Sequence, residues 1–435
     1  MNFPLATLTC VLLLSSLIGT PLAAQREPGK SEPGETLAWN EVPRPGQQPE
    51  GVSYTFDLQQ ETDGVPLTPP PSFPADHKWS VTKQTLKGGM QEGVQLIEVN
   101  NGAIQFTIIP TRGMSIYNVV SGDLELGWQS PVKHIVHPQH IDLNDHGGLG
   151  WLAGFNELMV RCGVAFAGHP GEDDGKMLTL HGRIGNIPAH DVSIAVDSKP
   201  PHRIRVRGKV SERMFKFSQF DLWTEVSTIP GSHSIQINDV LVNQSDYAQE
   251  YQIIYHTNFG RPLLEQGAQF VAPVKTLAPF DTYAAKDLGS YATYLGPTPN
   301  YGEQVYCATL FADAAGQTAV MLKDADGQQG AGIRYDSGTL PYFTLWKNTD
   351  TEADGYVTGL EPGTGYPYNR SVERGEGRVP KLGAGQLTRF ALDIEVLQER
   401  AAVERFQQQI KILQGNRQTA ISETPPRTEK QDPEE

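Results

Sequence analysis

The stretch GYVTGLEPGTGYPYN, residues 355–369, carries a single carboxylate near the end of a predicted strand. Its first half alternates between two sets of side chains, a period of two that predicts a β-strand. Glu361 shares a face with Val357 and Gly359, because side chains two residues apart point the same way, and both neighbours are small. Pro362 cannot donate to a sheet ladder, so the strand should end just past Glu361. This carboxylate is a candidate catalytic base, or else an acceptor for the loop that follows.

Short strand patterns of the same kind recur through the middle of the chain. They are rich in Val, Ile, Tyr, Phe and Thr and are separated by Gly, Asn, Asp and Pro turns. They cover residues 94–99, 104–109, 114–119, 204–210, 216–228, 234–242, 251–257, 304–311, 318–322, 342–346 and 387–396. Because no long helices are interleaved, they predict an all-β fold, a large antiparallel β-sandwich.

Helical patterns are few. Apolar residues recur at spacings of three and four over 398–413, which predicts a helix at the C-terminal end of the sandwich. The apolar stretch 151–161 also fits a helix.

The two ends of the chain differ from this β-rich part. An apolar run from Leu5 to Leu22, followed by small residues, is typical of a secretory signal peptide over 1–24, although no Lys or Arg precedes it. Residues 25–74 are rich in Pro, Gly, Glu and Gln and predict a flexible lead-in, and 416–435 predict a disordered tail. The folded domain is therefore expected over 75–415. The protein is expected to be secreted or periplasmic, with cleavage near Ala24.

Charge and cysteine content argue against several classes of protein. A net charge of −15 disfavours nucleic acid and anionic membranes as partners. Cys10 lies in the apolar run, which leaves Cys162 and Cys307, too few for a disulfide scaffold. These two could be free buried thiols or could form one disulfide. The chain has no P-loop, dinucleotide fingerprint or G-x-S-x-G motif.

Two histidines stand in polar, strand-associated motifs. His181 follows a strand-like run and precedes Gly182, so the backbone could bring a ligand close. His256 shares one strand face with Gln252 and Asn258. Buried polar groups cost about 1–3 kcal/mol each without a hydrogen bond, so this face needs a ligand or polar neighbours.

An arginine in a turn and a Trp-Lys pair on a strand are further candidates for residues that bind a ligand. Arg112, in the turn PTRGM at 110–114, could bind sugar hydroxyls or pair with a carboxylate such as Glu361. Trp346 and Lys347 end a strand that should return as 355–361 through a hairpin, which would place both near the hairpin loop and not beside Glu361. A Trp face also suits the C–H surface of a sugar.

Four histidines gather within 134–146, namely His134, His137, His140 and His146. Imidazole is a common metal ligand, but the spacing matches no H-E-x-x-H pattern and Pro138 divides the group. We therefore expect a loop that lines or covers a polar site, and no metal.

Four motifs in order resemble the galactose mutarotase (aldose 1-epimerase) superfamily, and most of all its poorly characterised branch, a domain of unknown function. They are T-R-G at 111–113, H-G-x-x-x-N at 181–186, Y-H-x-N-x-G at 255–260 and W-K…G-x-E-P-G at 346–363. The resemblance spans about residues 90–400. It implies a large β-sandwich that binds a carbohydrate on one sheet.

The resemblance also implies roles for single residues. Glu361 would take the proton of the anomeric hydroxyl, His256 would protonate the ring oxygen, and His181 would help to bind and orient the sugar. Arg112, Asn186, Asn258, Trp346 and Lys347 are expected to contact the substrate. Opening a cyclic hemiacetal needs an acid and a base together, and no metal or organic cofactor.

The implied activity is an exported aldose 1-epimerase that acts on a small sugar or an oligosaccharide. The aspartate that mutarotases use on a substrate hydroxyl has no clear counterpart; Asp246 and Asp281 are only candidates. Two alternatives stay open: a non-catalytic carbohydrate-binding sandwich, and a glycan lyase or hydrolase on the same fold. The sugar and the oligomeric state are also open.

Overall fold

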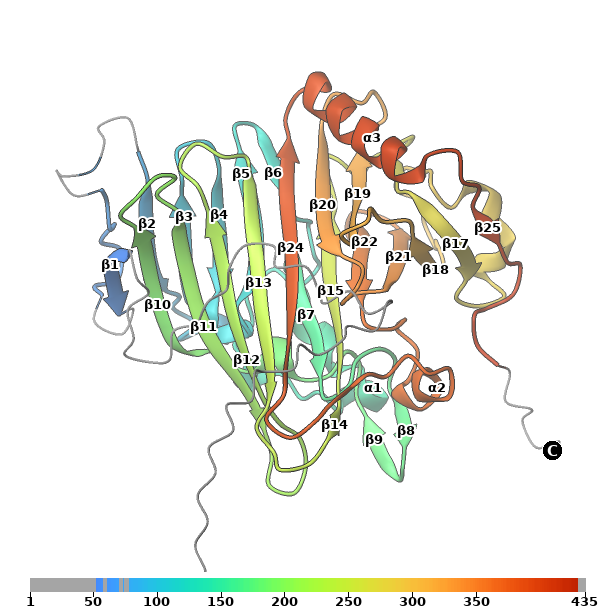
Figure 1. The fold of residues 1–435 in the computed structure, drawn as a ribbon, viewed down its shortest axis with the longest axis horizontal. Helices are drawn as coiled ribbons and strands as arrows, with labels where there is room; N and C mark the ends of the chain where they lie inside the picture. Colours follow the sequence, from blue (N-terminus) through green and yellow to red (C-terminus); the bar gives the residue numbers. More distant parts are fainter. Residues whose placement is uncertain (1–51, 58–60, 70–72, 74–77, 429–435) are drawn as a thin grey trace, which may run out of the picture. The chain divides into compact units, whose positions relative to one another are not determined.

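Two large sheets dominate the computed structural model, which describes residues 52–57, 61–69, 73 and 78–428 (Figure 1). These residues belong to one unit of the chain, 39–435; the other unit, 1–38, lies outside the described residues, and so does the predicted signal peptide. In order across the nine-stranded sheet, the strands are β1 (Val52–Asp57), β10 (His190–Asp197), β11 (Ile204–Arg213), β12 (Gln219–Thr228), β13 (Ser234–Asn243), β24 (Leu387–Leu397), β20 (Gly330–Asp336), β19 (Gln317–Lys323) and β16 (Gln269–Val271).

The second sheet has twelve strands within the described part of the chain. In spatial order they are β2 (Ser80–Thr85), β3 (Gln95–Asn100), β4 (Gln105–Ile109), β5 (Ser115–Ser121), β7 (Met159–Val164), β15 (Gln252–Phe259), β22 (Tyr356–Gly363), β21 (Tyr342–Thr349), β18 (Gln304–Leu310), β17 (Val274–Pro279) and β25 (Ala420–Ile421), with β6 (Leu124–Leu126) beside β5.

Smaller elements surround these sheets. Two short strand pairs are β8 (Gly171–Asp173) with β9 (Lys176–Leu178), and β14 (Gln249–Glu250) with β23 (Lys381–Leu382). The helices are α1 (Asp145–Gly148), α2 (Arg370–Gly375), α3 (Arg400–Gln414) and the 3₁₀ turns η1 (Gly89–Gln91), η2 (Pro110–Arg112), η3 (Pro138–His140), η4 (Gly150–Gly154), η5 (Ile184–Asn186) and η6 (Ala284–Ser290). No helix among the described residues is long and apolar enough to cross a membrane.

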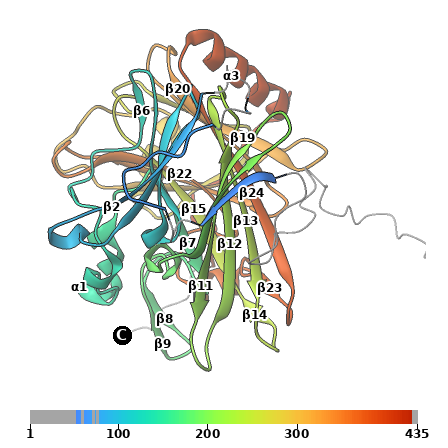
Figure 2. The same ribbon diagram turned by 90° about the vertical axis from the view of Figure 1, so that its left-hand side faces the viewer.

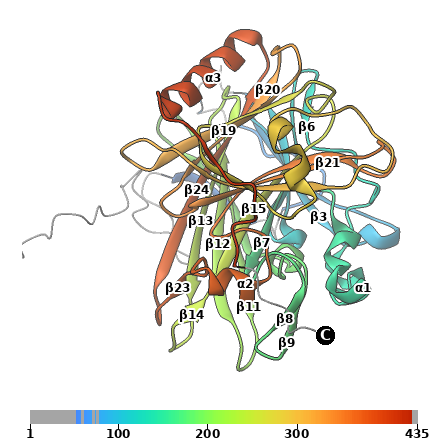
Figure 3. The ribbon, with the colours of Figure 1, turned by 90° about the vertical axis from the view of Figure 1, so that its right-hand side faces the viewer.

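The two sheets pack face to face as layers (Figures 2 and 3). One apolar cluster joins Val206 and Ile237 of the nine-stranded sheet to Phe106 and Tyr255 of the other. Neighbouring strands are antiparallel, apart from the parallel pair β17–β25. The predicted large antiparallel β-sandwich is therefore confirmed.

The two sheets differ in how their outer faces are covered. Buried and half-buried residues alternate along most of β11, because its second face is turned outward. All eight residues of β15 are buried. Its odd-numbered side chains, such as Tyr255, point into the sandwich, and its even-numbered ones, such as Ile254, join a separate cluster with Trp151 on the outer face. A layer of loops therefore covers the middle of the twelve-stranded sheet.

A buried polar network ties the sheets together near β15. Arg161 of β7 donates from Nη2 to Asp239 of β13 at 3.0 Å, and the hydroxyl of Tyr255 donates to the same carboxylate at 2.7 Å. Burial raises the pKa of Tyr255 well above its usual value. The tyrosine therefore stays a hydrogen-bond donor that holds β15 against the opposite sheet.

The predicted C-terminal helix is confirmed as α3, which lies across the ends of β19 and β20 in Figure 1. Its buried residues Val403, Phe406 and Ile410 pack on Ala319 and Met321 of β19. The spacings of three and four in the sequence therefore correspond to the face that packs on the sheet.

The helix expected over 151–161 is wrong. Residues Gly150–Gly154 form the 3₁₀ turn η4, and Met159–Val164 form β7, a strand with all six residues buried. A strand covered on both faces loses its alternation of apolar and polar residues, so the sequence pattern does not distinguish it from a helix.

The expected lead-in and tail are both partly ordered. Strand β1 pairs with β10, and Leu67 bridges to Val81, within the region 25–74 that composition marks as flexible. In the predicted disordered tail, β25 pairs with β17, which adds backbone hydrogen bonds that composition does not reveal. Residues 429–435 lie outside the described part.

Candidate active site

A pocket of about 470 Å³ opens on the loop-covered face of the twelve-stranded sheet. Its floor comes from β15, β22, β21 and β18, and most of its walls come from the segments between β6 and β10, with further residues from the loops next to β18 and β22. The lining residues are Trp128, Ser130, Pro131, Val132, Leu149, Trp151, Leu152, Phe155, His169, Pro170, Leu180, His181, His256, Glu303, Val305, Thr344, Trp346, Asn348, Asp354, Gly355, Val357, Glu361 and Pro367. This size and this mixture of aromatic and convergent polar groups are typical of small-molecule sites.

Glu361 and His256 meet at the floor of the pocket. Thr257 pairs with Leu360 across β15 and β22, so the residues before and after them, His256 and Glu361, stand opposite each other on one face. The Nε2 atom of His256 lies 3.2 Å from Oε1 of Glu361, and the two side chains are 6% and 2% exposed. The proposed acid and base are thus neighbours with little access to water.

A glycine makes room for this pair. A Cβ atom on Gly359 would lie 2.3 Å from Oε1 of Glu361 and 3.2 Å from Cε1 of His256. Any larger residue would therefore displace the carboxylate. The small side chains expected beside Glu361 do leave space above the sheet.

Burial shifts the pKa values of the pair in opposite directions. Burial, and to a smaller extent the charge of Glu303, raises the pKa of Glu361 well above 4.5. Burial lowers the pKa of His256 to about 4, against the opposing hydrogen bond to Asn258. Both shifts favour uncharged groups. The two shifts together favour a pair that holds a single proton, on Glu361 opposite Nε2 of His256, from which it can pass between the two groups.

Asn258 orients His256 and does not face the pocket. Its Oδ1 lies 2.7 Å from Nδ1 of His256, and its amide donates to the carbonyl of Glu157 at 3.1 Å. Since Oδ1 can only accept, Nδ1 carries a hydrogen and Nε2 is left to face Glu361. Asn258 was predicted to contact the substrate, but the structure places it completely buried and outside the pocket lining.

Replacing Asn258 tests this positioning role. We expect Asn258→Leu to lower the kcat of the reaction proposed below roughly 10–100-fold, since it removes one hydrogen bond to an imidazole that becomes charged. Asn258→Asp keeps the acceptor and adds a negative charge, so the acid limb of the pH–rate profile should move to higher pH. Unchanged kcat in Asn258→Leu, or an unmoved acid limb in Asn258→Asp, would contradict the role.

His181 lies beside the pair. Its ring centroid is 5.4 Å from that of His256, and it is 8% exposed. Its backbone has a φ of +57°, a left-handed conformation that aims the ring into the pocket from the turn before Gly182. Burial, with the nearby His256 and His169, lowers the pKa of His181 well below 6.5. It is therefore a neutral imidazole, suited to hydrogen bonding with a ligand.

Several buried polar atoms in the pocket have no hydrogen-bond partner among the described residues. They are Nδ1 of His181, Oγ1 of Thr344 and Nε1 of Trp151; Oε1 of Glu361 has only its contact with His256 at 3.2 Å. A buried polar group without a partner is costly, so these atoms favour a ligand that carries hydrogen-bonding groups.

Aromatic rings form the walls around these groups. The ring of Trp346 lies 5.4 Å from that of His256, and Phe155 packs between Trp346 and Trp151 at 6.1 and 4.7 Å. Trp346 pairs with Gly359 across β21 and β22, and Thr344 pairs with Glu361. The expectation that Trp346 lies away from Glu361 is therefore wrong, because the strand pairing continues past the tryptophan and puts it on the same face.

Glu303 is a pocket carboxylate that the sequence patterns do not single out. Its Oε2 accepts a hydrogen bond from Nε1 of Trp346 at 2.8 Å, and its side chain is exposed. It stands just before β18, where acidic residues are common and carry no signal of their own. Only the pairing of β18 with β21 brings it to the pocket.

Three other predicted substrate contacts lie elsewhere. Arg112 is fully buried and bonds through Nε to Glu157 at 2.8 Å, so its partner is not Glu361. Lys347 points to the opposite face of β21, where Nζ donates to the carbonyl of Thr293 at 2.8 Å. Asn186 ends η5, which packs on η2, and does not line the pocket. The structure places these three residues outside the pocket lining: a buried ion pair holds Arg112 there, and strand alternation turns Lys347 to the opposite face.

The histidine-rich loop and the cysteines do not add to the site. The described residues contain no group of three or more His, Cys, Asp or Glu side chains placed to hold a metal ion. None of the four histidines of 134–146 lines the pocket, although Val132, just before them, does. Cys162 and Cys307 are both free and buried, so they form no disulfide.

Comparison with known proteins identifies the family. The family described as Domain of unknown function (DUF4432) matches residues 91–396. The chain belongs to this family. This DUF4432 chain is also 41% identical to a protein from Klebsiella pneumoniae described as a "putative aldose 1-epimerase", with a TM-score of 0.80 over 87% of this chain and 96% of that one.

More distant structures were also found for this DUF4432 chain. A galactose mutarotase-like protein from Clostridium acetobutylicum is 13% identical, with a TM-score of 0.48 over 73% of this chain and 98% of that one. A galactose 1-epimerase from Lactobacillus acidophilus is 13% identical, with a TM-score of 0.47 over 74% and 98%. A search of curated proteins found no match. The predicted resemblance to the aldose 1-epimerase superfamily, in a branch of unknown function, is confirmed by the family match and by the Klebsiella protein.

Proposed function

We propose that this protein interconverts the anomers of a free sugar, as an aldose 1-epimerase does. The observation that carries the proposal is the contact of Glu361 with His256 at 3.2 Å, on the floor of a pocket with aromatic walls. The 41% identity to a Klebsiella protein described as a "putative aldose 1-epimerase" supports the same reaction class.

The chemistry follows from one shared proton. In the pyranose, the anomeric hydroxyl and the ring oxygen are bonded to the same carbon, so both lie within reach of adjacent side chains. The shared proton first passes from Glu361 to Nε2 of His256. Glu361 then takes the hydroxyl proton while His256 gives its proton to the ring oxygen; the bond between C1 and the ring oxygen breaks and an aldehyde forms. After rotation about the C1–C2 bond, the ring closes on the other face of the carbonyl, and both protons return. The pair ends in its starting state.

The walls fit the two surfaces of a pyranose. Trp346 and Phe155 offer flat faces to its C–H groups, while His181, Thr344 and Glu303 can bond to its hydroxyls. The proposed substrate is therefore a monosaccharide, or the reducing end of a longer sugar.

Optical rotation tests the proposal directly. Freshly dissolved α-aldoses should reach their equilibrium rotation faster with the protein than without it, for at least one sugar of a panel. No acceleration with any sugar, together with sugar binding, would favour the non-catalytic alternative. Shortened products from an oligosaccharide would favour the lyase or hydrolase alternative instead.

The rate of this reaction should depend on pH in a bell shape. Below about pH 4, His256 becomes protonated, so the pair carries two protons and has no base. Above the raised pKa of Glu361, the pair carries none and has no acid. We expect kcat/KM, after subtraction of the uncatalysed rate, to fall at both ends. An alkaline limb near the ordinary pKa of a glutamate would contradict the shared-proton state.

Export is part of the same proposal. The apolar N-terminal run suits a signal peptide cleaved near Ala24. The mass of the mature chain isolated from its native cells would show whether residues 1–24 are removed.

A further inference from the structure

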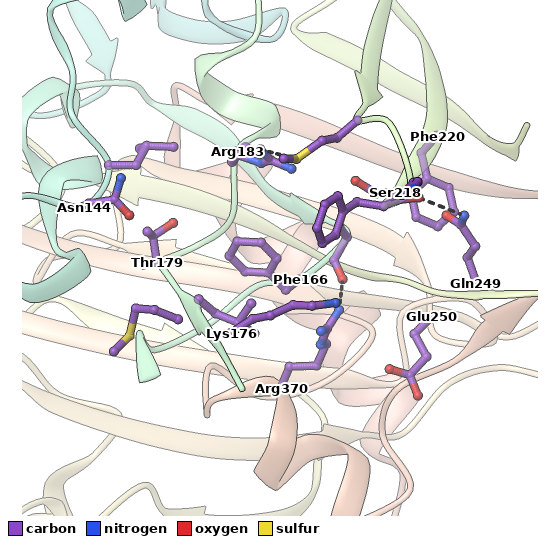
Figure 4. Close-up of a pocket in the computed structure, with 17 residues that line it drawn as sticks. Asn144, Phe166, Lys176, Thr179, Arg183, Ser218, Phe220, Gln249, Glu250 and Arg370 are labelled. Carbon is purple, nitrogen blue, oxygen red and sulfur yellow. Dashed lines mark hydrogen bonds between the residues drawn. The ribbon is translucent and has the colours of Figure 1, made fainter. Parts of the chain in front are cut away.

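We propose that a second pocket, separate from the candidate active site, binds small organic anions that have a flat apolar body. Its volume is about 540 Å³. Its walls come from the β8–β9 hairpin, the turn between β11 and β12, and the start of α2 (Figure 4). The proposal does not rest on the epimerase reaction.

The apolar part of the pocket is large and open. Phe166, Leu178 and Phe220 line it, and two of its side chains at the rim, Met177 and Phe217, are 64% and 45% exposed. Large apolar side chains that converge on a hollow from separate hairpins are typical of a ligand site.

The charge balance of this pocket is positive. Its lining includes four cationic side chains and one carboxylate. Three of these five charges have a partner of opposite sign. The pairs are Arg370 with Asp173 at 2.6 Å, Glu250 with Arg374 at 2.7 Å, and Arg183 with Glu212 at 3.6 Å. The lining as a whole therefore favours an anion.

Two lysines of the lining have no carboxylate partner among the described residues. Nζ of Lys176 lies over the ring of Phe217 at 4.9 Å, and Nζ of Lys216 lies over the ring of Phe215 at 5.4 Å. Both ammonium groups are thus held against apolar surface at the rim. An anionic group whose apolar body enters the pocket would meet them.

Two hydroxyls complete the site. Thr179 is 6% exposed, and its Oγ1 has no hydrogen-bond partner among the described residues; the same holds for Oγ of Ser218. Figure 4 shows Thr179 and Ser218 on opposite sides of the pocket, with Phe166 between them. Each could donate to an oxygen of a carboxylate, sulfonate or phosphate.

A pair of matched fluorescent probes tests the inference. 8-Anilinonaphthalene-1-sulfonate has an apolar body and one negative charge, and N-phenyl-1-naphthylamine has the same body without the charge. We expect the sulfonate to bind the full-length protein at one site, with an affinity at least roughly tenfold above that of the neutral probe. Its affinity should fall as salt is added.

Variants connect the binding to this pocket. The double variant Lys176→Gln/Lys216→Gln should lower the affinity for the sulfonate roughly tenfold and leave the affinity for the neutral probe unchanged. Phe217→Ala should lower the affinity for both probes. Lys286→Gln is the matched control, because Lys286 also lies over an aromatic ring, that of Tyr283 at 4.8 Å, but outside the pocket. Circular dichroism would verify that each variant is folded.

Two results would overturn the inference. One is equal affinity for the charged and neutral probes. The other is sulfonate binding that the double lysine variant leaves unchanged. Neither depends on whether any sugar is converted, so the proposed epimerase activity can fail without affecting this test.

Discussion

Glu361→Gln is expected to lower the kcat of anomer interconversion by about 10²–10⁴-fold, the usual contribution of a positioned acid–base group. Glutamine has the same shape, but its amide cannot take the proton of the anomeric hydroxyl. Because Glu361 is 2% exposed and bounded by Gly359, water has little room to replace it. Polarimetry with freshly dissolved sugar measures the rate.

Two comparisons sharpen this result. Glu98→Gln, in an exposed position of β3, should leave kcat unchanged. The double variant Glu361→Gln/His256→Gln should lose little more activity than the worse single variant, since the two residues act on one proton as a unit. Glu361→Gln with near-full activity would mean that another carboxylate is the base, and Glu303 would then be the first to test.

Arg112→Met is expected to destabilise the fold by about 3–5 kcal/mol, because it leaves Glu157 as an unpaired buried charge. Both side chains of this pair are 0% exposed, and the guanidinium also donates to the carbonyl of Val136 at 3.1 Å. The T-R-G motif implies a substrate-binding arginine, whereas the structure gives it a structural partner. Urea or guanidinium denaturation measures the free energy of unfolding.

A second variant separates the structural role from a binding role. Arg112→Met/Glu157→Leu removes both charges and should recover much of the lost stability. Arg405→Met, in an exposed position on α3, should change stability by less than about 0.5 kcal/mol. Unchanged stability in Arg112→Met with a raised KM for sugar would contradict the structural role.

The candidate site was only partly predictable, because the sequence shows local patterns around single residues but not which distant residues come into contact. Glu361, His256 and His181 could be named since each has a local signal: a lone carboxylate on a strand, or a histidine in a polar motif. The contact of Glu361 with His256 depends on the pairing of β15 with β22, and their opposite pKa shifts depend on burial under loops distant in the chain. Glu303 has no local signal.

By itself, the sequence determined the sandwich, because the period-two patterns reflect which face of each strand is buried. It also determined α3, whose apolar spacing reflects its packing on β19. Only the tertiary structure decided the partners of individual polar groups. Arg112 with Glu157 and Lys347 with Thr293 are contacts between residues whose spacing carries no signal. Local periodicity sets which way a side chain points, but the pairing of strands and loops sets what it meets.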